Sequence, residues 1–336
     1  MDSESQLVER TGRAIPSSKG RRGLANLRLG IGDDAAVLVP TGRAEWVLSC
    51  DAFLEGVHFL EKVHPPDSVG YKALVRAASD LVAMGATPRL FLLTLALPSR
   101  LTGDWLDSFL RGMGRAARLL DMRLAGGDTT RSQSVFINVT VLGEASLGQA
   151  VARSGAQPGD IIYVSGKLGG AQLGLELTIN RGTRGPGLSR LLRPHLYPSI
   201  RTKLGEWLGR HGVPSAMMDI SDGLSTDLDR LCRASHAGAR LWAASIPRVS
   251  IPDLISRQRK RLNLDPLKLA LHGGEDYELL FTVSHRKVKR LRHAPGFREL
   301  TPIGEITSRR GMILIGEDGR SETLEPAGWD PFRKKS

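Results

Sequence analysis

Residues 79–97 read SDLVAMGATPRLFLLTLAL and join two kinds of secondary structure within one short segment. The first part completes an apolar pattern with helical spacing, and Gly85 followed by Pro88 is typical of the place where a helix ends. The second part, residues 90–97, is an unbroken apolar run with the length of a buried strand. The segment therefore predicts a helix, with Asp80 inside it, followed by a strand.

Short strands and longer helices alternate in the same way along the rest of the chain. We expect a helix capped by Asp67 or Ser68 that runs to Gly85, helices at residues 103–120 and 224–237, and strands at residues 46–49, 122–125, 135–142, 161–164, 216–219 and 278–283. This alternation is typical of a mixed α/β (α+β) architecture. The predicted fold class is therefore α/β.

The length of the chain indicates more than one domain. Its 336 residues exceed the roughly 100 to 200 residues that one domain usually contains. Residues 143–159 are small and polar and end in a Pro-Gly pair, so we place a domain boundary within them. We expect a basic N-terminal lead at residues 1–24, an N-terminal domain at residues 25–148 and a C-terminal α/β domain at residues 149–336.

Aspartates recur beside glycines or at the ends of predicted strands. Asp51 follows the strand at residues 46–49, and Asp128 lies on a predicted loop, Gly126–Arg131. Any one of them could be a turn residue or a helix cap. Charged groups rarely collect in such places unless they are paired or bind a metal, so the set as a whole favours a metal site. The set is Asp33, Asp34, Asp51, Asp80, Asp128, Asp219 and Asp222.

The residue types in this set indicate which metal the site would hold. Carboxylates are hard oxygen ligands that suit Mg2+, and the sequence has no His/Cys cluster for zinc or iron. Because Mg2+ usually bridges carboxylates to substrate phosphates, we expect a nucleotide or polyphosphate substrate. The phosphate-binding loop Gly-x-x-x-x-Gly-Lys-Ser/Thr is missing, and residues 166–170 differ from it in spacing. Phosphoryl transfer would then depend on metal ions and arginines, without a covalent nucleophile and, for a phosphate acceptor, without a general base.

Charge and cysteine content narrow the class of protein further. The net charge of +12 favours anionic partners, and the basic runs at residues 257–261 and 285–290 could bind nucleic acid or form solvated helix faces. Neither run has the interleaved aromatic residues of a nucleic-acid module, so we expect no nucleic-acid partner. Two cysteines, Cys50 and Cys232, are too few for a disulfide scaffold. No apolar stretch reaches the roughly 20 residues that span a bilayer, and we expect a cytoplasmic protein without membrane contact.

Six short motifs occur in an order and at spacings that resemble the thiamine-monophosphate kinase family. The resemblance covers about residues 25–332 and implies a fold shared with aminoimidazole ribonucleotide synthetase. In that fold an N-terminal sheet pairs across a homodimer, a C-terminal α/β domain follows, and ATP with several Mg2+ ions lies between the two domains. The implied reaction transfers a phosphoryl group from ATP to thiamine phosphate and makes thiamine diphosphate. The motifs are Gly30–Ala36, Gly56–Phe59, Ser79–Ala86, Gly126–Arg131, Asp219–Leu224 and Gly273–Leu279.

The resemblance also implies roles for single residues, each with a simpler structural alternative. For Mg2+ the implied ligands are Asp34, Ser49, Cys50, Asp51, Asp80, Asp128, Asp219 and Asp222. For ATP they are Gly127, Asp128, Arg153 and Ser221, and for thiamine phosphate His58, Glu275 and Trp329. His58 could instead be a turn histidine, Arg153 a surface ion pair, Glu275 a brace of its loop and Trp329 a hydrophobic plug.

One residue departs from the family pattern, and related enzymes remain as alternatives. The family usually has threonine where this chain has Cys50, and a thiol is a poor partner for Mg2+ unless the position acts through its backbone carbonyl. Selenophosphate synthetase, aminoimidazole ribonucleotide synthetase and a hydrogenase-maturation protein have the same fold. A selenophosphate synthetase would need a reactive cysteine near its N-terminus, and this chain has none before Cys50. A hydrogenase-maturation protein would end in a cysteine, whereas this chain ends in Ser336. His58 and Glu275, within their motifs, favour thiamine phosphate over the substrate of aminoimidazole ribonucleotide synthetase.

Overall fold

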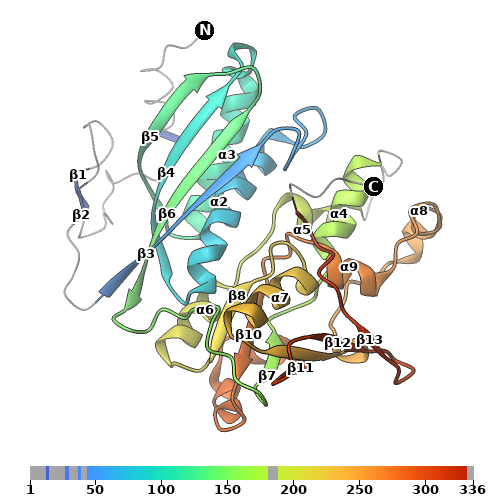
Figure 1. The fold of residues 1–336 in the computed structure, drawn as a ribbon. Helices are drawn as coiled ribbons and strands as arrows, with labels where there is room; N and C mark the ends of the chain where they lie inside the picture. Colours follow the sequence, from blue (N-terminus) through green and yellow to red (C-terminus); the bar gives the residue numbers. More distant parts are fainter. Residues whose placement is uncertain (1–12, 15–26, 30–36, 39–43, 181–187, 331–336) are drawn as a thin grey trace. The chain divides into compact units, whose positions relative to one another are not determined.

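The computed structural model of the chain describes residues 13–14, 27–29, 37–38, 44–180 and 188–330. The chain divides into two compact units, residues 1–81 with 86–150, and residues 82–85 with 151–336. Both units combine strands with helices, so the predicted α/β class is confirmed (Figure 1). A separate short pair joins β1 (Leu27–Leu29) to β2 (Val37–Leu38). Asp34, a predicted Mg2+ ligand, lies outside the described residues.

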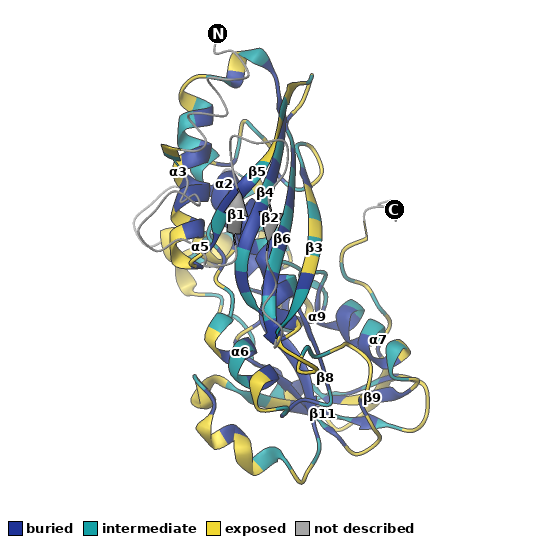
Figure 2. Ribbon diagram, turned by 90° about the vertical axis from the view of Figure 1, so that its left-hand side faces the viewer, coloured by how far each residue is buried: buried dark blue, intermediate teal, exposed yellow. Residues whose placement is uncertain are grey.

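The first unit is built on a four-stranded sheet in the order β3-β6-β4-β5. The strands β3 and β6 pair antiparallel over their full length, β4 pairs antiparallel with β6, and β4 and β5 are parallel. Two long helices cover one face of the sheet (Figures 1 and 2). The elements are β3 (Ala44–Leu54), α2 (Pro66–Ala83), β4 (Thr87–Leu97), η1 (Ser99–Leu101), α3 (Asp104–Leu119), β5 (Arg123–Arg131) and β6 (Phe136–Ser146).

Alternation along the central strand β6 separates a buried face of this sheet from an open one. Ile137, Val139 and Val141 are fully buried on the helix-covered face, while Leu142 is only partly buried. On the edge strand β3, Leu48 pairs with Leu142 and is 63% exposed. The open face thus carries apolar side chains that the described residues of this unit leave in contact with solvent.

The elements predicted for this unit are present, but two predicted positions within it are wrong. The strand at residues 90–97 and the helix at residues 103–120 are present as β4 and α3. Asp51 does not lie at a strand end, because β3 continues to Leu54 and every residue of β3 pairs with β6. Gly126–Arg131 is not a loop, because it forms β5 against β4, and this backbone pairing outweighs the low strand preference of glycine.

The helix that was expected to be capped by Asp67 or Ser68 begins slightly earlier, at Pro66. Proline is favourable in the first helical turn because its missing N–H would have no partner there. The Ser68 hydroxyl instead donates back to the carbonyl of Pro65 at 2.7 Å. The helix continues through Asp80, as predicted, and ends shortly before Gly85.

The second unit is built on a seven-stranded sheet in the order β13-β12-β9-β11-β7-β10-β8. Its strands are β7 (Ile161–Val164), β8 (Ala216–Asp219), β9 (Gly238–Trp242), β10 (Leu279–Val283), β11 (Thr301–Thr307), β12 (Gly311–Ile315) and β13 (Ser321–Thr323). Its α-helices are α4 (Gly170–Ile179), α5 (Leu188–Leu196), α6 (Thr202–Arg210), α7 (Leu224–Ala234), α8 (Ser256–Arg261) and α9 (Pro266–His272). Single-turn helices are η2 (Ala243–Ser245), η3 (Asp253–Ile255), η4 (Val288–His293) and η5 (Phe297–Glu299).

Alternate residues of the central strands in this second sheet feed two hydrophobic clusters. Ile162 and Leu280 join one cluster with Leu228 of α7, while Phe281 joins another with Leu208 of α6. The sheet is therefore buried on both faces, and the loops at its strand ends are held by packed elements. Among the described helices, none is both long and apolar enough to cross a membrane.

The crossing of α2 and α3 in the first unit depends on glycine. A Cβ on Gly112 would lie 1.8 Å from the carbonyl oxygen of Asp67, and a Cβ on Gly70 would lie 2.0 Å from that of Phe109. Backbone atoms leave no room at these points, so the helices approach as closely as they do only because both positions have no side chain. Helix α2 carries Asp80 and Arg76, so this contact also positions the site described below.

We expect Gly112→Ala to lower the melting temperature, although alanine normally favours a helix over glycine by about 1 kcal/mol. The added Cβ must push α3 from α2, and such overpacking costs about 1 to 3 kcal/mol. Thermal unfolding followed by circular dichroism measures the effect. The control is Arg111→Ala at the neighbouring exposed position of the same helix, which should change stability by less than about 0.5 kcal/mol. A Gly112→Ala protein at least as stable as the parent would contradict the close crossing.

Candidate active site

Strand β3 and helix α2 bring three of the predicted site residues together. Ser49 and Asp51 alternate onto the helix-covered face of the sheet, and the Ser49 hydroxyl donates to Asp80 Oδ2 at 2.5 Å. Arg76, one turn before Asp80 on α2, donates to both oxygens of Asp51 at 2.6 and 2.9 Å. The guanidinium also lies over the ring of Phe53, 5.2 Å from its centroid. The result is a partly buried cluster of oxygen atoms with one bidentate ion pair.

The neighbouring residue Cys50 points to the opposite face. Its thiol is exposed and lies 3.2 Å from Asn138 Oδ1, and the Thr140 hydroxyl donates to Cys50 Sγ at 3.4 Å. Cys50 and Asp51 are consecutive in one strand, so their side chains must point to opposite faces. The Cys50 thiol therefore does not join Ser49 and Asp80, and only the backbone of Cys50 remains next to them.

Asp128 shares the open face with Cys50 but lies on another strand. The register of the sheet pairs Asp128 with Thr94, and Thr94 with Asn138. Since β3 and β5 are the two edges of the sheet, Asp51 and Asp128 are three strand spacings apart, or about 14 Å. Gly127 lies tightly against β4, because a Cβ there would be 1.8 Å from the Leu93 carbonyl oxygen. One copy of this sheet therefore keeps Asp51 and Asp128 in separate places.

His58 lies in the loop that follows β3. Its Nδ1 accepts a hydrogen bond from the Leu54 backbone N–H at 3.0 Å, and its ring stacks on Phe53. Because Nδ1 accepts, the neutral ring carries its proton on Nε2, which is then a donor. His58 is thus positioned by the same strand that carries Asp51.

A buried aspartate organises the corresponding loop of the second unit. The Oδ2 atom of Asp227 on α7 accepts three backbone hydrogen bonds, from Ser221 at 3.1 Å, Asp222 at 2.9 Å and Gly223 at 3.1 Å. Burial and the nearby Asp222 charge raise the pKa of Asp227 to about 7, while these donors and Arg230 act in the opposite direction. The predicted residues Ser221 and Asp222 therefore owe their positions to a residue that the sequence did not single out.

Arg230 and the end of β8 complete this loop. Arg230 Nη1 donates to Asp222 Oδ2 at 2.5 Å and to Asp227 Oδ1 at 3.0 Å. Asp219, the last residue of β8, is 5% exposed, so the prediction of an aspartate at a strand end is confirmed here. One signal in the sequence could have pointed to Asp227, because it lies between Leu224, Leu228 and Leu231 on the buried face of α7.

The loop with Glu275 packs against the loop of Ser221. The Glu275 backbone N–H donates to the Ser221 carbonyl at 2.8 Å, and the backbone at Glu275 and Tyr277 is left-handed, with φ of 68° and 50°. The Glu275 carboxylate lies 3.1 Å from Nδ1 of His195, which is fully buried in α5. This strained loop holds its charged side chain against a second residue that sequence reasoning missed.

The next residue, Asp276, binds backbone groups of a segment that lies about a hundred residues earlier in the chain. Its carboxylate accepts the backbone N–H groups of Gly169 at 2.6 Å and Ala171 at 3.1 Å, at the beginning of α4. Burial raises the pKa of Asp276 to about 7, and the backbone donors act against that shift. The backbone N–H groups at the start of α4 are thus already bound by the Asp276 carboxylate.

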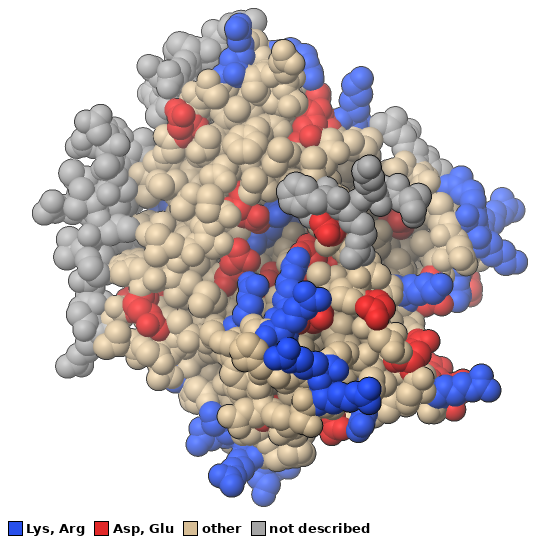
Figure 3. All heavy atoms as spheres, viewed as in Figure 1, with Lys and Arg blue, Asp and Glu red and all other residues tan. Residues whose placement is uncertain are grey.

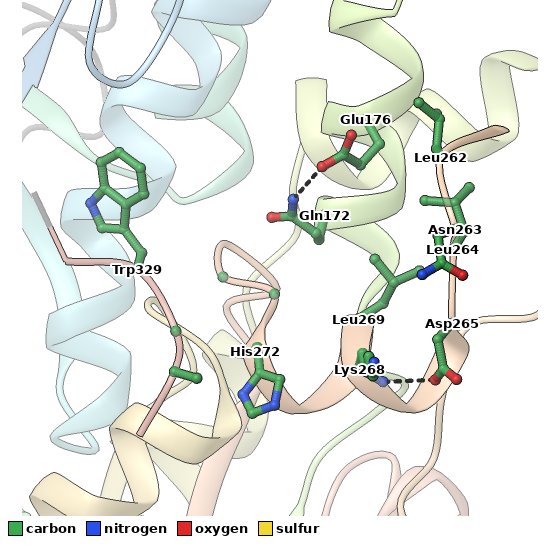
Figure 4. Close-up of a pocket in the computed structure, with 14 residues that line it drawn as sticks. Gln172, Glu176, Leu262, Asn263, Leu264, Asp265, Lys268, Leu269, His272 and Trp329 are labelled. Atoms are coloured by element: carbon green, nitrogen blue, oxygen red, sulfur yellow. Dashed lines mark hydrogen bonds between the residues drawn. The ribbon is translucent and has the colours of Figure 1, made fainter. Parts of the chain in front are cut away.

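Trp329 lies beside the Asp222 loop and forms one wall of a pocket. Its backbone N–H donates to the Asp222 carbonyl at 2.8 Å, and the residue is 39% exposed. Gly328 permits this approach, since a Cβ there would lie 2.0 Å from the same oxygen. The pocket measures about 360 Å3, and α4, α9 and residues 262–265 form its other walls (Figure 4).

The remaining predictions concern exposed charges and the metal. Arg153 is exposed on the segment before β7. In the view of Figure 3, Lys and Arg side chains lie in several groups, with acidic side chains near them. Within the described ranges, no three His, Cys, Asp or Glu side chains come close enough to hold a metal. The carboxylates and the hydroxyl of Ser49 are nevertheless hard oxygen donors of the kind that Mg2+ prefers, and Mg2+ seldom relies on protein ligands alone.

Comparison with known proteins identifies the family of the chain. Residues 32–145 match the model of the AIR synthase related protein, N-terminal domain. The chain is 37% identical over 314 residues to the thiamine-monophosphate kinase of Escherichia coli K12, which covers 91% of this chain and 93% of that protein.

Solved structures agree with this result. A thiamine-monophosphate kinase from Stenotrophomonas maltophilia K279a is 34% identical with a TM-score of 0.77, covering 94% of this chain and 96% of that one. A structure described as AaThiL complexed with AMPPCP and TMP is 32% identical with a TM-score of 0.75, covering 89% and 91%. The chain belongs to the thiamine-monophosphate kinase family.

Proposed function

We propose that this protein transfers the γ-phosphoryl group of ATP to thiamine phosphate and releases thiamine diphosphate and ADP. The observation that carries the proposal is the 37% identity to the Escherichia coli enzyme across 91% of the chain. A relative of 32% identity has been solved with AMPPCP and TMP, and AMPPCP has the shape and charge of ATP. The described loops supply the oxygen donors and glycines that such substrates need.

We assign the nucleotide to Gly127, Asp128, Arg153 and Ser221. Gly127, next to Asp128 on β5, has its backbone against β4, where a Cβ would lie 1.8 Å from the Leu93 carbonyl oxygen. Ser221 lies on the loop that Asp227 orders, and Arg153 is an exposed cation. Backbone N–H groups, a hydroxyl and a guanidinium are the groups that bind phosphate oxygens in sites without a lysine-bearing loop.

Mg2+ is the metal that these donors fit. The residues that would hold it are Asp34, Ser49, Cys50 through its backbone, Asp51, Asp80, Asp128, Asp219 and Asp222. When bound, the ions neutralise phosphate charge and draw two polyanions together. Of this chain's own groups, Arg76 orients Asp51 by donating to both of its carboxylate oxygens, and Arg230 orients Asp222 by donating to its Oδ2. Both arginines also leave each carboxylate with further lone pairs for a cation.

Thiamine phosphate is assigned to His58, Glu275 and Trp329. The Trp329 indole offers a flat aromatic face to the cationic thiazolium ring, and Glu275 offers negative charge. The Nε2–H of His58 can donate to a phosphate oxygen. The acceptor oxygen is already an anion at neutral pH, so the transfer needs no general base, and positioning with charge compensation provides the rate.

A homodimer and a cytoplasmic location are further parts of the proposal. The open face of the first sheet exposes Leu48, and a second copy packed on that face would remove this apolar surface from water. Two free cysteines, Cys50 and Cys232, fit a reducing compartment.

Incubation of the purified protein with ATP, Mg2+ and thiamine phosphate should yield thiamine diphosphate, detected by chromatography, and excess EDTA should stop the reaction. Asp128→Asn should abolish turnover at an unchanged melting temperature, because Asp128 is exposed and its removal leaves phosphate charge uncompensated. Asp121→Asn, which changes a carboxylate that is 81% exposed, is the matched control and should retain parental activity. Full activity of Asp128→Asn, or of the parent in EDTA, would exclude the metal-dependent mechanism.

Trp329→Ala should raise the KM for thiamine phosphate by about two- to thirtyfold and leave the KM for ATP nearly unchanged. An aromatic face over a cation contributes about 0.5 to 2 kcal/mol, and the backbone N–H that binds Asp222 is retained in the variant. Trp329→Phe keeps an aromatic ring, so its KM for thiamine phosphate should lie between those of the parent and of Trp329→Ala. A hydrophobic plug would give a different result, in which the melting temperature drops and both KM values rise together.

Leu48→Glu should convert the dimer into a monomer, because a carboxylate on the open face opposes burial of that face against a second copy. Sedimentation velocity measures the change in mass. Leu147→Glu changes a residue of the same unit that is 69% exposed beyond the end of β6, and it should remain dimeric. If both variants sediment like the parent, the open face is not the dimer contact.

A further inference from the structure

The pocket beside Trp329 contains a polar pair that the proposed substrate residues do not explain. Gln172 and Glu176 lie one turn apart on α4, and the Gln172 amide Nε2 donates to Glu176 Oε1 at 3.0 Å. Both side chains line the pocket, on the wall formed by α4, whereas Trp329 belongs to another wall (Figure 4). The pocket volume of about 360 Å3 lies in the range of small-molecule sites.

The contacts of Glu176 leave its charge available to a ligand. Its partners are side-chain amides, Gln172 at 3.0 Å and Asn180 at 3.4 Å, which orient the carboxylate without neutralising it. The pair therefore presents a carboxylate acceptor beside an amide group that has one further N–H and a carbonyl oxygen. Acceptor and donor stand next to each other on one helix face.

Two other polar side chains of the pocket, Asp265 and His272, already have structural partners. Asp265 Oδ1 caps α9 by accepting the backbone N–H groups of Leu267 at 2.8 Å and Lys268 at 2.9 Å. His272 Nδ1 lies 2.9 Å from the Ser225 hydroxyl, and burial together with the Lys268 charge lowers the pKa of His272. Glu176 is the carboxylate best placed to accept from a ligand in this pocket.

We propose that the Gln172–Glu176 pair selects the 4-aminopyrimidine end of thiamine phosphate; this inference rests on the proposed function. A 4-aminopyrimidine presents an amino donor next to a ring-nitrogen acceptor, which matches a carboxylate next to an amide N–H. The Trp329 wall suits a flat cationic molecule, and the Glu176 charge favours the same cation. Adenine presents a similar edge but no cation, so the pocket chemistry favours thiamine phosphate over ATP.

Glu176→Gln tests the pair, because it keeps the size of the side chain and replaces an acceptor oxygen with a donor. We expect kcat/KM for thiamine phosphate to fall by about ten- to a hundredfold, since the amino group of the substrate loses its charged partner. The KM for ATP should remain within twofold, and the melting temperature should be unchanged. Gln172→Leu, which removes the amide that orients Glu176, should give a smaller loss in the same direction.

Substrate specificity can be measured with oxythiamine phosphate, in which an oxo group replaces the amino group of the pyrimidine. The parent should use it at least tenfold less efficiently than thiamine phosphate, and Glu176→Gln should narrow that ratio because an amide N–H can donate to the oxo group. Glu206→Gln on α6 is the control, since Glu206 pairs with Arg210 on the surface. The control should keep the ratio of the parent.

The possible outcomes separate this inference from the proposed function. If the parent makes no thiamine diphosphate, the proposed function fails and the inference fails with it. If the parent is active and Glu176→Gln keeps the discrimination of the parent, only the inference is overturned. A rise in the KM for ATP without a change for thiamine phosphate would assign the pocket to adenine, and would also overturn it.

Discussion

Asp227 forms the interaction on which the site of the second unit depends. Its buried carboxylate accepts the backbone N–H groups of three consecutive residues, Ser221, Asp222 and Gly223. An unpaired carboxylate at this depth would be costly, and the three donors with Arg230 compensate for its desolvation. Once the loop is held in this way, its carbonyl groups become fixed acceptors. Ser221 receives the N–H of Glu275, and Asp222 receives the N–H of Trp329. One carboxylate therefore orders segments that lie about fifty and a hundred residues further along the chain.

In the first unit, charged groups lie on the face of the sheet that the helices cover. Asp51 and Asp80 tolerate their partly buried positions because each has a short-range partner, Arg76 for Asp51 and Ser49 for Asp80. Helix α2 supplies both Arg76 and Asp80, and its close crossing with α3 determines where they stand. Packing and chemistry are coupled here, because a shift of α2 would move the groups that hold two predicted ligands.

A shifted pKa does not by itself mark chemistry in this protein. Burial raises the pKa of both Asp227 and Asp276 to about 7, yet their oxygens are occupied by backbone N–H groups of a loop and of a helix start. Such groups shape the surroundings of the site, while residues that would meet phosphate or metal lie on the loops they support. The adjacent residues Glu275 and Asp276 illustrate the division, since one faces His195 and the other closes α4.

The sequence alone determined the α/β class, most element positions and the family, because apolar periodicity, helix-ending glycines and motif order are local properties of the chain. Local pattern could not reveal that Gly126–Arg131 is a paired strand, since glycine-rich segments become strands only when a neighbour such as β4 supplies the hydrogen bonds. Local pattern also could not predict that the Asp51 side chain faces the helices while the Cys50 side chain faces away from them. Which face of a strand is covered depends on where the helices pack on the sheet. Partners such as Asp227, His195 and the Gln172–Glu176 pair emerged only from the tertiary structure. Their roles arise from contacts between residues, and contact distances are set by packing rather than by spacing along the chain.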